Sequence, residues 1–288
     1  MSVASGDGLI TRIFPQPATT RSLRGLYLTH DLRGQGDLGK PLVYTNFITS
    51  LDGRISERGP GGHRRVPAAI ANPHDWRLYL ELMAQADVVL TTARHLRGVA
   101  AGREEMPGLA GDETADLVSW RRARGLAPTP AIAVVSAALD LPVARLLLKH
   151  PGPLLLLTNG AVEGSRVAAL EAEGAEVLAV GAGRYPTARE ILAGLSSRGY
   201  RCIYSIAGPR VFHTLVAGGA LDRLYLTIAQ TVIGGSGDTL LPDAQLPSPA
   251  SFALQAAYCD SRGARGVGQL FLVLVPATGH GEPPARDD

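Results

Sequence analysis

The sequence predicts an α/β protein with a mostly parallel central sheet flanked by helices and an antiparallel C-terminal hairpin. In the middle of the chain, short apolar runs bounded by Gly or Pro alternate with amphipathic stretches of helical length, a pattern typical of parallel strands buried on both faces. Near the end, "SFALQAAYCDSRG" and "GVGQLFLVLVP" follow each other without a helix between them, which indicates a hairpin. Since each helix must bury its apolar stripe against the sheet, we expect layers of helix, sheet and helix.

One domain over residues 41–276 is the expected organisation, because no linker divides the middle of the chain. Residues 1–40 are predicted to be an N-terminal extension. Its first 20 residues, rich in Pro, Thr and Gly, are expected to be frayed, and "LRGLYLTHDL" (23–32) is expected to form a short strand. The polar tail 277–288 is expected to be disordered.

Within the domain, "VYTNFITSLDGRIS" (43–56) is the opening strand and its turn. A helix is predicted over 72–86, with Asn72 as N-cap and Pro73 at the first helical position. Residues 87–97 should begin as a strand and continue as a helix, and a further helix is predicted over 113–125. Later strands are expected in "PAIAVVS", "GPLLLLTNG" and "AEVLAVG", with helices in "SRVAALEAEG" and "TAREILAGLSSRG".

Composition excludes several function classes. The 288 residues carry a formal charge of only +2 and scattered basic residues, so we expect no nucleic-acid surface and no membrane surface. No signal peptide and no apolar run long enough to span a bilayer is present. Cys202 and Cys259 lie far apart in strand-like runs, which fits reduced thiols. We therefore expect a cytoplasmic protein whose partner is a small molecule.

Candidate binding positions follow from the fold class. Ligands of open α/β sheets bind beyond the carboxyl ends of the strands, where this chain places "TT" (91–92), Ser136, "TNG" (158–160) and "AGPR" (207–210). In "AGPR" a strand ends at Gly208 and Pro209 opens a helix, whose N-terminal N–H groups and dipole favour a phosphate. The same pattern is also typical of an ordinary strand-to-helix turn.

Other motifs are weak or absent. The sequence contains neither G-x-G-x-x-G after the first strand nor G-x-x-x-x-G-K-[ST]. His63, His74 and His95 lack the spacing of metal ligands, so no metal site is predicted. "SLDG" is explained by a turn in which Gly53 adopts a left-handed conformation. The turn does not explain why Asn46, Thr49 and Ser50 precede it.

Four stretches carry a family resemblance: "NFITSLDGRIS", "AQADVVLTTARHLR", "EAEGAEVLAV" and "SIAGPRVFHTLVAGGALDRLYLTIAQTVIGG". Together they resemble the reductase domain of the bifunctional riboflavin-biosynthesis deaminase/reductase, over residues 41–276 and in the expected order. The resemblance implies a dihydrofolate-reductase-like fold, NADPH as hydride donor and, usually, a homodimer. The zinc signature of the deaminase half is absent from this sequence, so the resemblance implies a stand-alone reductase.

The resemblance also implies roles for individual residues. The end of the first strand faces nicotinamide and substrate together, so its polar residues should line the reaction cleft. Asp52 is the candidate proton donor, with water or a purely structural turn cap as alternatives. The expected substrate contacts are Asn46, Ser50 and Arg65. The expected cofactor contacts are Thr49, Thr92, Arg94 (or Arg97), Ser136, Thr158, Gly208, Pro209, Arg210, Val211 and Phe212.

Departures from the family pattern lie on the substrate side. Met83 occupies the place of a substrate-gripping Arg, and Ile206 the place of a Glu. His95 and Val99 occupy the places of a Thr and an Asp. An Arg supplies a bidentate contact to phosphate that Met cannot replace. Arg64 and Arg65 are candidate substitutes.

Three hypotheses stay open on this basis. The first is a pyrimidine reductase of the riboflavin pathway with a rearranged phosphate grip. The second is a reductase of the same fold that acts on a pterin or a secondary metabolite. The third is a protein that binds nucleotide without turnover. In the first two, hydride passes to a carbonyl or imine carbon of a small heterocyclic metabolite.

Overall fold

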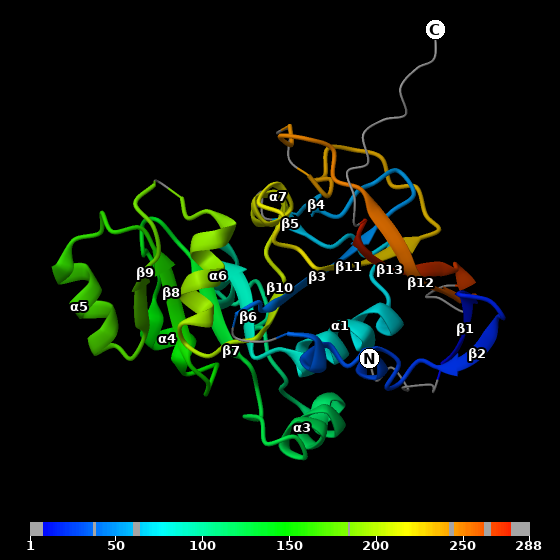
Figure 1. Ribbon diagram of the computed structural model, residues 1–288, viewed down its shortest axis with the longest axis horizontal. Coiled ribbons are helices and arrows are strands. Elements are labelled where there is room, and N and C mark those ends of the chain that lie inside the picture. Colours follow the sequence, from blue (N-terminus) through cyan, green and yellow to red (C-terminus); the bar gives the residue numbers. More distant parts are fainter. Residues whose placement is uncertain are drawn as a thin grey trace, which may run out of the picture.

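The computed structural model describes residues 8–36, 39–59, 64–183, 185–241, 245–261 and 266–277. An 11-stranded sheet runs through the molecule in the order β2-β1-β12-β13-β11-β3-β10-β6-β7-β8-β9 (Figure 1). Its strands are β1 (Leu9–Phe14), β2 (Thr19–Ser22), β3 (Leu42–Thr49), β6 (Val88–Thr92), β7 (Ala131–Val135), β8 (Leu154–Thr158), β9 (Glu176–Ala179), β10 (Cys202–Ser205), β11 (Arg223–Ala229), β12 (Phe252–Asp260) and β13 (Gln269–Pro276). A separate ribbon pairs β4 (Glu57–Arg58) with β5 (Arg64–Arg65).

The sheet has a parallel part and an antiparallel part. The run β11-β3-β10-β6-β7-β8-β9 is parallel throughout. Strands β13, β12, β1 and β2 continue it with antiparallel pairings. The predicted α/β class, with a mostly parallel centre and an antiparallel C-terminal hairpin, is confirmed.

Helices cover both faces of the parallel part. They are α1 (Pro73–Gln85), α2 (Ala93–Ala100), α3 (Ala115–Arg122), α4 (Val143–Leu147), α5 (Gly164–Ala172), α6 (Ala188–Ser196) and α7 (Pro209–Ala217). Because side chains alternate along a strand, Leu155 and Leu157 of β8 pack into the cluster that includes α6 and α7. Leu154 and Leu156 pack on the other face, with residues of α2, α4 and α5. Helices α1 and α3 cover that same face nearer the middle of the sheet.

The helix starts follow the sequence signals. Asn72 caps α1 by accepting a hydrogen bond from the N–H of His74 at 2.8 Å, and Pro73 is the first helical residue. Gly208 is the N-cap of α7 and Pro209 its first residue. Both starts were predicted, because a cap and a proline act within a few residues of the chain.

The N-terminal extension differs from the prediction. Within the first 20 residues, which were expected to be frayed, the chain forms β1 and begins β2, and β1 pairs with β12 near the end of the sheet. The stretch 23–32, expected to be a strand, instead contains the 3₁₀ helix η1 (Tyr27–His30) and the start of η2 (Leu32–Gln35). A short 3₁₀ turn, η4 (Asp112–Thr114), precedes α3. The first seven residues and residues 278–288 of the tail lie outside the described part.

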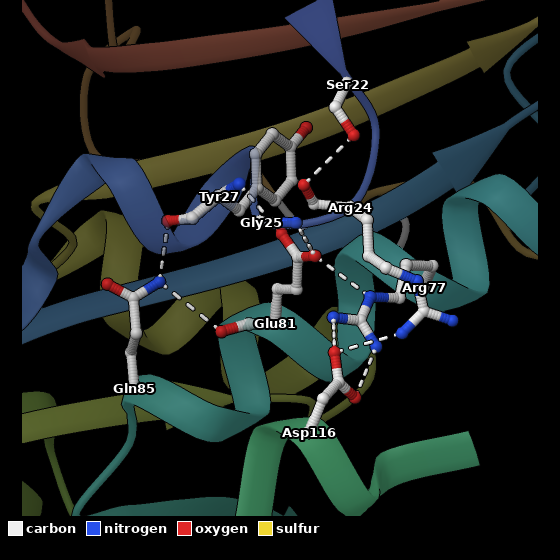
Figure 2. A network of polar contacts seen from close by, with 8 residues as sticks. All are labelled: Ser22, Arg24, Gly25, Tyr27, Arg77, Glu81, Gln85 and Asp116. Atoms are coloured by element: carbon white, nitrogen blue, oxygen red, sulfur yellow. Dashed lines mark hydrogen bonds and ion pairs between the residues drawn. The ribbon is translucent and has the colours of Figure 1, made fainter. Parts of the chain in front are cut away.

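Side chains of α1 explain why residues 23–32 do not form a strand. Glu81 accepts the backbone N–H groups of Gly25 at 2.5 Å and Tyr27 at 2.9 Å (Figure 2). Gln85 accepts the N–H of Leu32 at 3.0 Å. Backbone donors that a strand would offer to a neighbouring strand are therefore taken by one helix. Within the described residues, no helix is long and apolar enough to cross a membrane.

Candidate active site

A cleft of about 2060 Å³ opens at the carboxyl ends of β3, β6 and β10. Its floor contains residues of those strands and of the turn after β10: Asn46, Phe47, Ile48, Thr91, Thr92, Ile206, Ala207, Gly208 and Pro209. One wall is the first half of α1, and another is the ribbon β4–β5. Residues 102–108 and part of 110–114 close the remaining side.

The cleft lies where the chain changes sides of the sheet. Strands β6 and β10 are hydrogen-bonded neighbours. The helix that follows β6, α2, packs on one face, whereas the helix that follows β10, α7, packs on the other. The N-termini of both helices therefore point toward the same edge, from opposite faces. Such a switch point is the usual ligand site of an open α/β sheet.

The turn into α7 leaves room for a ligand at its backbone. Gly208 and Pro209 line the cleft, and a Cβ added at Gly208 would meet no atom within 4 Å. The N–H groups of Val211 and Phe212 already bond to the carbonyl of Gly208, at 3.1 and 3.2 Å. Phe212 is buried and packs edge-on against Phe47, with ring centroids 5.0 Å apart. The side chain of Phe212 therefore packs α7 against β3 and does not face the cleft.

Val211 and Arg210 do not line the cleft either. Val211 packs against the apolar cluster under α7. Arg210 is exposed at the start of α7. Of the five residues predicted around this turn, Gly208 and Pro209 are those that the structure places in the cleft.

The start of α2 brings a second group of predicted residues together. Thr92 caps the helix by accepting the N–H of His95, at 3.4 Å. Thr92, Arg94 and His95 all line the cleft. Arg97 lies outside the cleft lining and donates to the carbonyl oxygen of Asp140 at 3.1 Å. Of the two arginines considered for a cofactor phosphate, Arg94 is the one that the fold places there.

The turn after β3 is held by a dense set of hydrogen bonds. Ser50 donates to Asp52 at 2.7 Å and accepts the N–H of Arg54 at 2.9 Å. Asp52 also accepts the N–H groups of Ile233 at 3.0 Å and Gly234 at 2.8 Å. These hydrogen bonds lower the pKa of Asp52 to about 2.

That geometry argues against Asp52 as proton donor. Its carboxylate is ionised at neutral pH, its oxygens are occupied, and neither it nor Ser50 lines the cleft. The alternative of a turn cap is what the structure supports, and Gly53 beside it has the expected left-handed backbone (φ 79°).

The hydroxyls expected near the cofactor are also buried outside the cleft lining. Thr49 donates to the carbonyl oxygen of Ser50 at 3.1 Å, and Ser136 accepts the N–H of Leu139 at 3.0 Å. Thr158 is buried, and its hydroxyl has no hydrogen-bond partner among the described residues. None of these side chains contributes to the cleft surface, so the predicted contacts from Thr49, Ser136 and Thr158 are not supported.

An acid that sequence reasoning missed does lie in the cleft. Asp75, in the first turn of α1, lines it and accepts a hydrogen bond from Thr227 of β11 at 2.6 Å. Burial raises the pKa of Asp75 to about 6, although the bond from Thr227 opposes the shift. In sequence, Asp75 resembles any acid in a first helical turn. Only the pairing of distant elements shows that its carboxyl group is buried.

Aromatic and amide groups surround that acid. Trp76 stacks on Tyr79 with centroids 4.9 Å apart, and both line the cleft. Asn46 also lines it, as predicted, and its Oδ1 accepts the hydroxyl of Tyr204 at 2.5 Å. The site thus offers a flat aromatic surface, an amide and a carboxyl group whose pKa is raised to about 6 by desolvation.

Comparison with known proteins assigns the chain to a family. The family model described as the RibD C-terminal domain matches residues 41–264. The chain belongs to the RibD C-terminal domain family. The fold is the dihydrofolate-reductase-like fold that the sequence resemblance implied. No curated protein matches the sequence.

Solved structures of similar fold have low sequence identity. A pyrimidine reductase-like protein from Corynebacterium diphtheriae is 19% identical with a TM-score of 0.63, and the match covers 83% of this chain and 93% of that one. RibD from Acinetobacter baumannii is 16% identical with a TM-score of 0.60, covering 83% of this chain and 58% of its own. The riboflavin biosynthesis reductase Rib7 from Saccharomyces cerevisiae is 14% identical with a TM-score of 0.52, covering 83% and 90%.

The positions at which this RibD family member departs from the family pattern do not all face the cleft. Met83 is fully buried in the core, so the position predicted to lack a gripping Arg does not face the cleft. Ile206 does line the cleft. Arg65, as predicted, lines it too, but pairs with Glu57 at 2.8 Å. Arg64 pairs with Asp238 at 2.6 Å.

The remaining departures are one cleft residue and one core residue. His95 lines the cleft, where its Nδ1 lies 3.2 Å from the hydroxyl of Thr91. Val99 is fully buried.

Among the described residues, no group of His, Cys, Asp and Glu could hold a metal ion, and His63 lies outside them.

Proposed function

We propose that this RibD family member is a reductase that uses NADPH to reduce a carbonyl or imine carbon of a small heterocyclic metabolite. The observation that carries the proposal is the cleft itself, in which two helix N-termini meet at a sheet edge within the same cavity as an acid of raised pKa. Phosphate groups favour such N-termini, and the acid can supply the proton that accompanies a hydride.

The residues present fit a nicotinamide dinucleotide phosphate. The backbone at Gly208 is open for a phosphate to approach, and Pro209 starts a helix whose dipole favours it. At the neighbouring helix start, Arg94 would pair with a further phosphate, the group that distinguishes NADPH from NADH. The cofactor supplies the hydride, and the protein supplies binding and orientation.

Asp75 is the proposed proton donor in place of Asp52. Thr227 donates to Oδ1 of Asp75, which leaves Oδ2 to carry the proton. With a pKa near 6, the carboxyl group is protonated in a useful fraction of molecules close to neutral pH and releases that proton readily. Thr227 keeps the carboxyl group in one orientation, so that the proton stays at the cleft surface.

The substrate class follows from the groups around that acid. A planar heterocycle would stack on Trp76 and Tyr79 and exchange hydrogen bonds with Asn46. A substrate of the pyrimidine-reductase type, 5-amino-6-(5-phosphoribosylamino)uracil, is the first candidate, because a Thermotoga maritima protein of similar fold is described as a reductase of that compound. A pterin or secondary-metabolite reductase is the alternative, favoured by Ile206 at the place of the family's Glu. A protein that binds nucleotide without turnover is the third possibility.

The proposal is tested first by a cofactor titration and then by a turnover assay. Nicotinamide fluorescence should report saturable NADPH binding by the purified protein, with NADH binding weaker. NADPH oxidation is then followed with the phosphoribosylaminouracil substrate and with pterins. Turnover of the first substrate supports the pyrimidine reductase, and turnover of a pterin supports the alternative. Binding without turnover of any substrate favours the third possibility, and no binding of either cofactor would sink the reductase proposal.

A further inference from the structure

A second, smaller cavity lies between the N-terminal extension and β12 of the family domain. It has a volume of about 370 Å³ and is lined by Arg12, Arg21, Ser22, Arg24, Gly25, Leu26, Thr29 and Tyr258. It shares no lining residue with the large cleft. Its size is in the range of pockets that hold small ligands.

Strand register explains why arginines converge there. Arg12 of β1 stands directly opposite Tyr258 of β12, and Arg21 of β2 stands opposite Ile10 of β1. Since side chains alternate between faces, Arg12, Arg21 and Tyr258 share the face on which Ile10 is buried. Both guanidinium groups act on the Tyr258 hydroxyl, since they oppose the rise that burial causes in its pKa.

Among the described residues, no acid pairs with the guanidinium groups of Arg12 and Arg21. Within the described residues neither forms an ion pair, and the Nε of Arg12 is buried without a hydrogen-bond partner. The Arg12 side chain donates a long hydrogen bond to the carbonyl of Pro17, at 3.4 Å. Arg24, by contrast, pairs with Asp116 at 3.0 Å (Figure 2). Cationic groups gathered in a cavity repel one another unless an anion lies between them.

Protection of a sheet edge against pairing with another chain does not explain why an arginine stands at position 12. Charged residues on edge strands commonly protect a sheet from pairing with another chain, and Arg21 on β2 fits that role. Strand β1, however, lies between β2 and β12, inside the sheet. An arginine with a buried, unsatisfied N–H group on an interior strand costs free energy. A ligand that accepts a hydrogen bond from this N–H group would offset that cost.

Tyr258 connects this cavity to a hydrogen-bonded chain. Its hydroxyl lies 3.1 Å from Nε2 of His30, and Nδ1 of His30 lies 3.0 Å from the hydroxyl of Tyr225. Burial lowers the pKa of His30 to about 4, so the ring is neutral and carries one N–H. If Tyr258 donates its proton into the cavity, it must accept from Nε2, and Nδ1 then accepts from Tyr225.

We propose that this cavity, the extension pocket, binds a phosphate group between Arg12, Arg21 and the hydroxyl of Tyr258. Arg12 and Arg21 supply charge-assisted hydrogen bonds, and Tyr258 donates one more. The volume leaves room for an organic group beyond the phosphate, so the ligand is either inorganic phosphate or a small phosphomonoester. Binding holds His30 as the tautomer with its proton on Nε2. This site is independent of the proposed reductase function.

Calorimetric titration of the full chain at constant ionic strength tests the site, with inorganic phosphate and glucose 6-phosphate as probes. We expect saturable binding by the wild type and a loss of affinity of about tenfold or more in the variant with Arg12→Gln and Arg21→Gln. Arg189→Gln, at an exposed position of α6, is the matched control and should bind as the wild type does. Tyr258→Phe, which keeps the ring, should bind more weakly.

The competing outcomes are distinct. No saturable binding by the wild type overturns the proposal, as does unchanged affinity in the double variant. Loss of phosphate binding in Arg94→Gln instead would place the anion in the cleft and also overturn it. Tighter binding of the ester than of phosphate identifies a metabolite site, and equal affinities identify a free-phosphate site. Nitrogen NMR of His30 adds a second readout, because saturation should fix one tautomer. Circular dichroism checks that each variant is folded.

Discussion

Asp52 and Asp75 differ in what surrounds their carboxyl groups. Asp52 is held by backbone N–H groups that stabilise its charge, and its pKa falls to about 2. Asp75 is partly exposed to the cleft, its carboxyl group lies beside a hydroxyl, and desolvation raises its pKa to about 6. Two acids in environments that separate their pKa values take different roles. The sequence pointed to Asp52, because "SLDG" marks it locally, whereas the environment of Asp75, the donor that we propose, depends on β11.

Asp75→Asn should remove the proton donor and leave binding intact. We expect the rate of substrate reduction to fall by about 10²–10⁴-fold. The wild-type rate should decline as the pH rises above about 6, because Asp75 then loses its proton. That decline should be absent from the residual activity of Asp75→Asn. Steady-state rates between pH 5 and pH 9, with the substrate that the turnover assay identifies, measure both effects.

Asp52→Asn is the matched control for this experiment. Its hydrogen bonds fasten the turn to Ile233 and Gly234, so we expect it to lower thermal stability and to keep the pH dependence of the wild type. A variant of Asp52 that lost the decline above pH 6, with Asp75→Asn retaining it, would restore Asp52 as the donor.

Asp75→Asn should also stabilise the protein without ligand. The folded-state pKa of Asp75 lies above its ordinary value of 3.8, at about 6, so folding favours the protonated form. Its stabilising contribution is complete below pH 3.8 and is lost as the pH rises through 6. At pH 7 the substitution removes a buried charge, and we expect the free energy of unfolding to rise by about 1–2 kcal/mol. Urea denaturation at pH 7 measures it, and an equal gain at pH 4 would contradict the assignment.

At the scale of elements, the start of α2 is where we propose that the phosphate specific to NADPH is recognised. Arg94→Gln should weaken NADPH binding by about tenfold, because it removes a charged contact to a phosphate, and should leave NADH binding unchanged. Arg97→Gln is the matched control three residues later, since its guanidinium bonds to the carbonyl of Asp140. Fluorescence titration with both cofactors measures the affinities of the wild type and of the two variants. An equal loss of NADH affinity in Arg94→Gln would show that Arg94 does not recognise the distinguishing phosphate.

Helix α1 stabilises the N-terminal segment through Glu81. This fully buried carboxylate accepts the N–H groups of Gly25 and Tyr27 and the Nε of Arg77, at 2.9 Å (Figure 2). Glu81→Ala leaves those donors buried without an acceptor, and we expect the free energy of unfolding to fall by about 3–5 kcal/mol. Glu171→Ala, at an exposed position of α5, should change it by less than about 0.5 kcal/mol. Urea denaturation compares the two, and similar small losses would contradict the role of Glu81.

The elements that sequence predicted are those with local signals. The start of α1 at Asn72 and Pro73 and the start of α7 at Gly208 and Pro209 depend on a few neighbouring residues. The segment 23–32 depends on Glu81 and Gln85, some fifty residues later, and its composition alone favoured a strand. Polar residues at strand ends were expected in the cleft. Thr92 is there, whereas Ser136 and Thr158 turn their hydroxyls into the protein.

At the scale of the whole molecule, the sequence predicted the layers and the edge of the sheet at which the cleft opens, because both follow from alternating strands and helices. The antiparallel end is larger than expected. Strands β1 and β2 extend it, and only their pairing with β12 reveals them. The homodimer implied by the resemblance stays a prediction.

That pairing makes the N-terminal strands part of one cooperative unit. Ile10 is 2% exposed and packs in the same cluster as residues of α1 and β3, whereas its neighbour Leu9 is 58% exposed. Ile10→Ala should lower the free energy of unfolding by about 2–4 kcal/mol, because it leaves a cavity in the shared core. Leu9→Ala, in the same strand, should change it by less than about 0.5 kcal/mol.

The shape of the unfolding transition shows whether β1 and β2 unfold together with the rest of the chain or independently of it. Tryptophan fluorescence reports on Trp76 and Trp120, both outside the extension, and circular dichroism reports on the whole backbone. If β1 and β2 unfold with the rest, both signals shift together in Ile10→Ala and the transition stays single. If the extension is an independent addition, circular dichroism gains an early step and the tryptophan transition stays at its wild-type midpoint. The burial of Ile10 beneath η1 and α1 argues for the single transition.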